Sequence, residues 1–461
     1  MDFIFHPIWG KIGGWALQLY RFKRGGVTPL HRRHEGKTLS SGASIERMPA
    51  PEKVCISMVQ GAGAPAKPVV KPSDLVTVGQ LIAEPAGFIG TRIHASVSGV
   101  VKGIVEMPTV AGGVAPHIVI ENDGQDTGYD FPETGRRLTG PEILSAIQEA
   151  GLAGMGGAGF PTHVKMTIPE GKRCELLLIN GAECEPFLTA DQRLMEEDPD
   201  RILRGVGYAM EALGVKEARV GIENNKPAAI AAMEKSAQGF AGVSICPMRT
   251  RYPQGSEKQL IQALARREVP QGGLPIDCGV VVLNVGTCAA IADAVERNKP
   301  LIERVVTVTG AVGRPSNLLC RIGTSFADAV AYCGGYGDHI EKLISGGPMM
   351  GFAQFTDEVT VGKGTSGILA LDHDHAKQFE EWPCTHCGKC VQVCPVGLMP
   401  LMIDAYSRAG KMDMADEYNA MDCMECGCCS YICPSRRHLT QSIRAAKREI
   451  LAARNAKKGG K

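Results

Sequence analysis

Two cysteine-rich runs near the end of the chain constrain its structure more than any other feature. CTHCGKCVQVCP places Cys384, Cys387, Cys390 and Cys394 before Pro395, and CMECGCCSYICP places Cys423, Cys426, Cys429 and Cys433 before Pro434. Both runs have the spacing C-x2-C-x2-C-x3-C-P, with which bacterial iron–sulfur proteins hold [4Fe–4S] clusters. We therefore predict two such clusters.

The spacing also predicts which thiolates share a cluster. Three thiolates of one tight loop bind one cluster, and the Cys-Pro pair ends the segment and gives its sulfur to the other cluster. Cluster 1 is thus predicted to take Cys384, Cys387, Cys390 and Cys433, and cluster 2 to take Cys423, Cys426, Cys429 and Cys394. Cys428 falls in a variable position between two ligands, so we interpret it as a bystander. The alternative metal, zinc, uses four ligands per site but does not explain two identical runs with trailing prolines.

Composition excludes some classes of partner. The 461 residues should hold about three to four domains. Lysine and arginine number 50 against 49 acidic residues and aromatics make up 5%, which argues against a nucleic-acid partner. The cysteines outside the two runs show no pairing rhythm, as expected in a reducing compartment. No apolar run is long enough for a membrane-spanning helix, so we expect a soluble or peripheral chain.

Residues 1–39 form a predicted arm that is aromatic at first and then basic. It contains Trp9 and Trp15 and then Arg21, Lys23 and Arg24. Such an arm can lie on a membrane surface, lie in a groove of a partner subunit, or pack on its own chain. Asp2, internal glycines and the missing cleavage site argue against a secretory signal.

Residues 40–132 are rich in valine, glycine and proline, and their short alternating runs predict a small β sandwich or barrel. The phrases VTVGQLIAE and IHASVSGVV resemble the barrel-sandwich hybrid fold of biotinyl and lipoyl carrier domains. Those carriers present a modifiable lysine at a hairpin tip, whereas residues 84–87 (EPAG) contain none. We therefore expect a structural domain that is not modified.

Residues 133–298 alternate between helical and strand patterns, which predicts an α/β domain with a mostly parallel sheet. In its glycine-rich stretch GLAGMGGAGFPTHVKM, Gly154, Gly156 and Gly159 satisfy G-x-G-x-x-G. A helical segment precedes this stretch and the strand CELLLIN follows it, the reverse of the ordinary dinucleotide fingerprint. A loop that cradles phosphate remains compatible with the pattern, because glycine lets backbone N–H groups approach closely.

The stretches GMGGAGFPTHVKM and LLINGAECEP resemble the glycine loop and acidic turn of the flavin-carrying, NADH-oxidising subunit of respiratory complex I. RYPQGSEKQL and VLNVGT match further pieces in the same order. With the barrel-sandwich segment in front and the twin cysteine runs behind, nearly the whole chain resembles the RnfC (RsxC) family of Rnf electron-transport complexes. In that family, residues 299–372 would form a β-grasp (SLBB) domain, residues 373–443 an α-helical ferredoxin-type domain, and residues 444–461 a basic tail.

The resemblance implies a site for FMN and NAD(H). Glycines of the loop would line it (Gly154, Gly156, Gly157, Gly159), with Phe160 stacking on a ring and Lys165 meeting the FMN phosphate. Asn180, Glu183 and Glu185 would hydrogen-bond the isoalloxazine or ribityl groups. The opposite wall would contain Tyr252, Gly255 and Glu257, and the phosphate end Asn284 and Thr287. Two positions depart from the complex I relatives: Ala182 replaces Asp, and Ser256 replaces Glu.

The fold class expected is therefore a multidomain α/β and α+β chain. The function expected is that of an electron-input subunit, which exchanges electrons with NAD(H) through FMN and two [4Fe–4S] clusters. No catalytic acid–base pair is required, since the flavin itself carries the hydride chemistry. Its partners would be other Rnf subunits, including integral membrane proteins and a ferredoxin-like cluster subunit, at the cytoplasmic face of the cell membrane.

Two alternatives remain open at this point. One is a cobalamin-reductase-like flavin and iron–sulfur protein of a bacterial microcompartment, which shares the architecture. The other is a wiring subunit that holds clusters but turns over no nucleotide, which the departures at Ala182 and Ser256 keep in play. The basic tail, with Arg444, Lys447, Arg448, Arg454, Lys457 and Lys458, could meet an acidic partner or anionic lipid, or form a solvated face.

Overall fold

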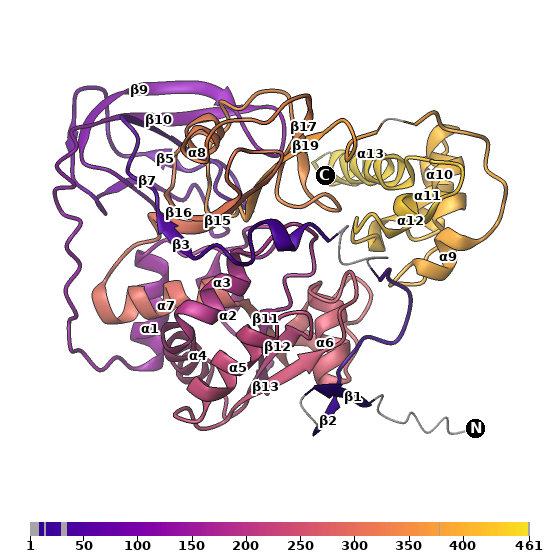
Figure 1. Ribbon diagram of the computed structural model, residues 1–461, viewed down its shortest axis with the longest axis horizontal. Coiled ribbons are helices and arrows are strands. Elements are labelled where there is room, and N and C mark those ends of the chain that lie inside the picture. The colour runs from indigo at the N-terminus through magenta and orange to yellow at the C-terminus, as the bar shows by residue number, and fades with distance from the viewer. Residues whose placement is uncertain (1–8, 13–14, 29–34, 378, 460–461) are drawn as a thin grey trace.

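A computed structural model describes residues 9–12, 15–28, 35–377 and 379–459 (Figure 1). Two β-rich domains lie side by side above an α/β domain, and a helical domain lies beside them. None of the described helices is both long and apolar enough to span a bilayer. The predicted fold class is confirmed.

The first β-rich domain is a sandwich of two antiparallel sheets. One sheet has the order β4-β10-β9-β6 and the other β5-β7-β8. Their strands are β4 (Lys53–Ser57), β5 (Lys67–Pro68), β6 (Leu75–Val76), β7 (Leu81–Glu84), β8 (Ile93–His94), β9 (Gly99–Pro108) and β10 (Val114–Asn122). Ile56, Ile82 and Ile118 are fully buried in the shared core. The turn between β7 and β8 contains no lysine, so the hairpin lacks the group that carrier domains modify.

The α/β domain is built on the parallel sheet β13-β12-β11-β14. Its strands are β11 (Leu176–Gly181), β12 (Ala218–Glu223), β13 (Val243–Met248) and β14 (Val280–Asn284). Leu177 and Ile179 face the core shared with α1 (Gly140–Glu149), α4 (Pro199–Leu213), α5 (Pro227–Ala237) and α7 (Val285–Arg297). Leu176 and Leu178 face α6 (Glu257–Ala265). Because side chains alternate along a strand, this continuously apolar strand can be buried on both faces.

The order of helices and strands around the glycine loop matches the predicted order in part. Helix α1 precedes the loop, as expected. A short helix, α2 (Thr162–Met166), stands between the loop and β11, where we expected the strand to follow directly. Helix α3 (Ala190–Glu197) follows the acidic turn, and the 3-10 turn η2 (Pro275–Cys278) precedes β14.

The second β-rich domain is a six-stranded sheet of order β18-β17-β19-β15-β16-β3. Its strands are β15 (Glu303–Gly310), β16 (Ser316–Arg321), β17 (Ile340–Ser345), β18 (Phe352–Gln354) and β19 (Gly367–Asp372), and α8 (Phe326–Tyr332) packs on it. The edge strand β3 (Ile45–Arg47) pairs in parallel with β16. Residues 45–47 therefore lie in this sheet, although the predicted boundary assigns them to the first β domain.

The cysteine-rich domain is helical. It contains α9 (Lys389–Val393), α10 (Pro400–Arg408), α11 (Met412–Glu417), η3 (Ala420–Asp422), α12 (Cys428–Ile432) and α13 (Leu439–Gly459). Helix α13 runs through the predicted boundary at residue 443. Arg444 and Lys447 pair with Glu425, each at 2.7 Å. Arg454 pairs with Asp416, so these cations of the predicted tail bind carboxylates of their own domain.

Residues 20–27 of the arm contact the α/β and cysteine-rich domains of their own chain, while the role of the rest of the arm stays a prediction. Strands β1 (Trp9–Ile12) and β2 (Trp15–Gln18) form a hairpin, and Tyr20 then forms a bridge with Met248 beside β13. In Figure 1, residues 20–28 run from this hairpin to the helical domain, and residues 35–44 lead through η1 (Lys37–Leu39) into β3. Phe3 and Phe5 lie outside the described residues.

Candidate cofactor sites

The two cysteine runs fold into the same local structure twice. In each run the second residue after the first cysteine has a positive φ (His386 54°, Glu425 58°), and so does the glycine that follows the second cysteine (Gly388 72°, Gly427 78°). A five-residue helix, α9 or α12, then begins. These tight left-handed turns bring the first three cysteines of each run to one side of a loop.

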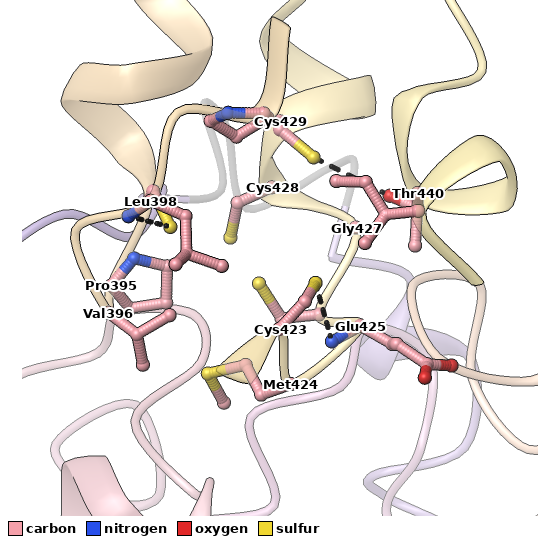
Figure 2. Close-up of a pocket in the computed structure, with 14 residues that line it drawn as sticks. Pro395, Val396, Leu398, Cys423, Met424, Glu425, Gly427, Cys428, Cys429 and Thr440 are labelled. Atoms are coloured by element: carbon pink, nitrogen blue, oxygen red, sulfur yellow. Dashed lines mark hydrogen bonds between the residues drawn. The ribbon is translucent and has the colours of Figure 1, made fainter. Parts of the chain in front are cut away.

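Two pockets separate the cysteines into two sets. One pocket is lined by Cys384, Cys387, Cys390 and Cys433. The other is lined by Cys394, Cys423, Cys426 and Cys429, together with Cys428 (Figure 2). Each pocket thus combines three cysteines of one run with the last cysteine of the other run. This is the grouping that the spacing predicts, although which thiols bind iron stays a prediction.

Backbone N–H groups donate hydrogen bonds to three of the cysteine sulfurs. The Sγ of Cys394 accepts from the Leu398 N–H at 3.3 Å, and that of Cys423 accepts from the Glu425 N–H at 3.4 Å, both drawn in Figure 2. In the other run the Cys384 Sγ accepts from the His386 N–H at 3.4 Å. Such bonds stabilise thiolates and tune cluster potentials.

The described thiols are not arranged for a single ion. No group of three or more His, Cys, Asp or Glu side chains in the described ranges could hold one metal ion. Tetrahedral zinc needs four sulfurs at about 2.3 Å from one point, whereas a [4Fe–4S] cluster spreads four thiolates around a larger body. The two pockets therefore fit the clusters better than the alternative, zinc.

The second candidate site lies at the carboxyl edge of the parallel sheet. Asn180, on β11, and Asn284, at the end of β14, lie opposite each other in register. The strand order β13-β12-β11-β14 reverses its direction of growth between these two strands. Such a switch point, at the carboxyl ends of parallel strands, is where open α/β sheets bind ligands.

The glycine loop lies against this edge. The Met155 N–H donates to the Thr287 Oγ1 at 3.1 Å. A Cβ on Gly156 would lie 2.8 Å from the Asn284 Nδ2, so only glycine lets the loop approach so closely. Gly156 and Gly157 are exposed at the tip. The backbone N–H groups at the tip are therefore open to a ligand over the switch point.

The loop is closed at its base by its own backbone and by the first β domain. The Gly154 N–H donates to the Phe160 carbonyl at 2.9 Å, while Phe160 itself is half-buried. Gly159 has a φ of 64°, and its carbonyl accepts from the Ala62 N–H at 3.2 Å. The loop thus has a fixed base and an open tip, as a phosphate cradle requires.

Three of the predicted wall residues make direct contacts with other predicted residues. The Lys165 Nζ lies 2.5 Å from the Glu257 Oε1. The Asn180 Nδ2 donates to the Gly255 carbonyl at 2.7 Å. Tyr252 is buried, and its hydroxyl donates to the Glu185 Oε1 at 3.3 Å. Segments 165, 180–185 and 252–257 therefore meet in one place, while their flavin contacts stay predictions.

The two glutamates of the acidic turn already bind protein groups. Glu183 accepts from the N–H groups of Asp191 (2.7 Å) and Gln192 (3.2 Å) at the start of α3. Glu185 accepts from the N–H groups of Met349 (3.1 Å) and Met350 (2.9 Å) in the β17–β18 turn. Burial raises the pKa of each carboxyl to about 7. In this structure the Glu183 and Glu185 carboxylates therefore hold the acidic turn in place.

Three residues that were not predicted from the sequence support the site through hydrogen bonds. Asp191 accepts from the Asn284 Nδ2 at 2.7 Å, and burial raises its pKa. The Arg304 Nη1 donates to the carbonyls of Lys363 (2.5 Å) and Met155 (3.4 Å). The Lys363 Nζ donates to the Gly151 carbonyl at 2.7 Å. Arg304 and Lys363 belong to the second β domain, and no local pattern links them to the glycine loop.

Four family models match successive parts of the chain. They are the RnfC barrel-sandwich hybrid domain (residues 21–125), the Nuo51 FMN-binding domain (147–293), the SLBB domain (305–353) and the 4Fe-4S dicluster domain (383–436). One subunit of the proton-translocating ferredoxin:NAD(+) oxidoreductase complex of Clostridium ljungdahlii is 47% identical over 398 residues, 86% of this chain and 85% of that protein. The chain belongs to the RnfC family.

Another relative is similar to this RnfC chain over nearly its whole length. It is a subunit of the Na(+)-translocating ferredoxin:NAD(+) oxidoreductase complex of Acetobacterium woodii, and it is 45% identical over 435 residues, which cover 94% of this chain and 97% of that protein. Among solved structures, an NAD+-reducing [NiFe]-hydrogenase in the H2-reduced state aligns with a TM-score of 0.47 and 20% identity, over 67% of this chain and 62% of that one.

Two of these family models cover the two candidate sites of the RnfC chain. The FMN-binding model covers the glycine loop, the acidic turn and the residues at the carboxyl edge of the sheet. The dicluster model covers all eight predicted cluster ligands. The donor sets fit these groups, because open backbone N–H groups with a nearby ammonium suit a phosphate, and four thiols per pocket suit a cluster.

Proposed function

We propose that this RnfC chain is the electron-input subunit of an Rnf complex, exchanging electrons between NAD(H), FMN and two [4Fe–4S] clusters. It would be part of an ion-translocating oxidoreductase of the ferredoxin:NAD+ type, the activity named for its relatives. When bound, FMN supplies the conversion between hydride transfer and single-electron transfer. The observation that carries the proposal is that one chain combines the switch-point site with two cysteine pockets. Buried Tyr252 of the α/β domain contacts the cluster 2 pocket and so links it to the switch-point site.

The protein residues have three tasks in this scheme. The tip of the glycine loop and Lys165 would bind the FMN phosphate, with Asn284 and Thr287 fixing the loop. Asn180, the acidic turn and the segment 252–257 would orient the ring and the nicotinamide. The cysteines of the two pockets would hold the clusters in the predicted sets.

The cysteines of the two pockets differ in their exposure, which supports an order of electron transfer. Tyr252 of the α/β domain packs against Cys426 and Cys428, so the cluster 2 pocket faces the nucleotide site. Cys387 of the cluster 1 pocket is exposed. Cluster 2 would therefore exchange electrons with the flavin, and cluster 1 with a partner.

The partners would be the other subunits of the complex, including integral membrane proteins and a ferredoxin-like cluster subunit. We place the chain at the cytoplasmic face of the cell membrane as a peripheral subunit. This placement is supported by the translocating complexes to which its relatives belong. Co-purification with integral membrane proteins would distinguish it from the cobalamin-reductase-like alternative, which nothing in the comparisons favours.

An anaerobic NADH titration of the flavin- and iron-loaded protein tests the proposal. Optical spectra would follow the flavin, and EPR spectra would follow the clusters. We expect the flavin to bleach and reduced-cluster signals to appear at substoichiometric NADH. Clusters that respond to dithionite but never to NADH would instead identify a wiring subunit without nucleotide turnover.

A further inference from the structure

A short piece of the arm, residues 24–27, lies between the α/β domain and the cluster 2 pocket. Val27 and Tyr252 exchange two backbone hydrogen bonds, each of 2.8 Å. The neighbouring Gly26 N–H donates to the Val393 carbonyl, also at 2.8 Å. Since Val393 directly precedes Cys394, three backbone hydrogen bonds connect the α/β domain to a cysteine of the cluster 2 pocket through the arm.

Two glycines allow this close approach. Gly25 and Gly26 have φ values of 65° and 77°, which side chains disfavour. A Cβ on Gly25 would lie 2.5 Å from the Cys394 carbonyl oxygen. A Cβ on Gly26 would lie 2.5 Å from the Tyr252 carbonyl oxygen. No other residue could occupy either position without moving the α/β domain and the cysteine loop apart.

Side chains surround the same junction. Tyr252 is 2% exposed and packs with Cys426, Cys428, Val27 and Met349. These residues come from the α/β domain, the cysteine-rich domain, the arm and the second β domain. Buried Tyr252 thus contacts all four parts of the chain at this junction, so a displacement of the arm would move its neighbours.

Arg251 and Lys37 anchor the arm on either side of the junction. Arg251 donates to the Gly25 carbonyl, and its guanidinium lies 4.8 Å from the ring centroid of buried Phe22. The Lys37 Nζ donates to the carbonyls of Glu183 and Glu185 (both 2.9 Å) and of Leu188 (2.5 Å). The arm thus holds the acidic turn of the proposed flavin site as well as the loop of the cluster 2 pocket.

We infer that residues 25–27 are a positioning element that sets the separation between the flavin site and cluster 2, and thereby the rate at which electrons pass between them. The inference rests on the proposed function. In the forward direction one electron leaves the reduced flavin and one enters cluster 2. The arm contributes no redox group to this step, and its role is to keep the Tyr252 segment against the Cys394 loop.

Gly26→Ala tests this role, with Gly42→Ala as the matched control. Gly42 lies just beyond the arm, has no neighbour within 4 Å of a built Cβ, and does not have a positive φ. Stopped-flow spectroscopy with NADH would separate flavin bleaching from cluster reduction. Iron content, FMN content and amide hydrogen exchange at Val27 and Tyr252 would report cofactor loading and the state of the bridge independently of activity.

We expect Gly26→Ala to retain its iron, its FMN and the rate of flavin bleaching. Exchange at the Val27 and Tyr252 amides should accelerate, and cluster reduction should slow several-fold relative to flavin bleaching, because electron transfer weakens as the two redox groups move apart. Gly42→Ala should match the parent. Opened amides with unchanged cluster reduction would overturn the inference.

A milder variant covers the case in which Gly26→Ala does not fold. Arg251→Met removes the bond to the Gly25 carbonyl and the cation above Phe22 but inserts nothing into the junction. It should slow cluster reduction in the same direction, and a rate equal to that of the parent would overturn the inference. If NADH fails to bleach even the parent flavin, the proposed function fails. The bridge can then still be tested, because amide exchange at Val27 and Tyr252 does not depend on nucleotide turnover.

Discussion

Lys165 and Glu257 form an ion pair, with the ammonium nitrogen 2.5 Å from a carboxylate oxygen, although 92 residues separate them in the chain. Lys165 lies in α2, just after the glycine loop, and Glu257 is the first residue of α6. The pair joins the two sides of the proposed FMN site. It fixes the position of the Lys165 ammonium, the group predicted to meet the FMN phosphate.

Lys165→Met should therefore weaken the binding of FMN but not that of riboflavin. A charge-assisted hydrogen bond contributes about 1.5–3 kcal/mol, so FMN affinity should fall by roughly 10- to 100-fold. Riboflavin lacks the phosphate and serves as the matched ligand. Fluorescence quenching titrations would measure both, and iron content should equal that of the parent. Equal loss of both ligands would place Lys165 away from the phosphate.

Cys428 and Cys429 are neighbours in the cluster 2 pocket with different predicted roles. Cys429→Ala removes a predicted ligand and should remove about half of the iron. Cys428→Ala should leave the iron content unchanged, because this thiol packs against Tyr252 and is not a predicted ligand. Iron analysis with EPR would measure both. Loss of iron in Cys428→Ala would show that this residue is more than a bystander.

Lys363 should make stability depend on pH above neutrality. Burial lowers its pKa from 10.5 to about 7, so the folded chain favours the neutral amine. The unfolded chain binds the proton more tightly, so stability should rise as pH increases from about 7 towards 10.5. The gain should be on the order of a few kcal/mol. Thermal unfolding of the holoprotein at several pH values should show a steeper rise than in Lys363→Met, whereas parallel curves would contradict the prediction.

Alanine substitutions at two glycines of α4 should change the free energy of unfolding in opposite directions. The Cβ of Gly205→Ala would overlap the Cys288 carbonyl of α7, and overpacking of this kind costs about 1–3 kcal/mol. Gly207 has no neighbour within 4 Å of a built Cβ, so Gly207→Ala should stabilise the helix by about 1 kcal/mol. Chemical denaturation would measure both changes. A stable Gly205→Ala would mean that α4 and α7 can separate without cost.

Much of the architecture could be predicted because the signals are local. Strand and helix periodicities indicated the first β domain and the parallel sheet, and the cysteine spacing predicted the two sets of four thiols. Each of these features depends on residues close together in the chain. The short helix α2 was missed because five residues give too little periodicity to identify a helix.

Local patterns in the sequence predict the cysteine sets and most of the secondary structure, whereas long-range packing joins the domains. Positive φ values shape the turn within each cysteine run, and they lie at residues close together in the chain. The positions of β3, Arg304 and the Gly25–Gly26 bridge depend instead on contacts between segments more than 200 residues apart, or 149 residues apart for Arg304 and Met155. Such contacts leave no periodic signal, because they arise when separately folded surfaces pack and bury their remaining polar groups.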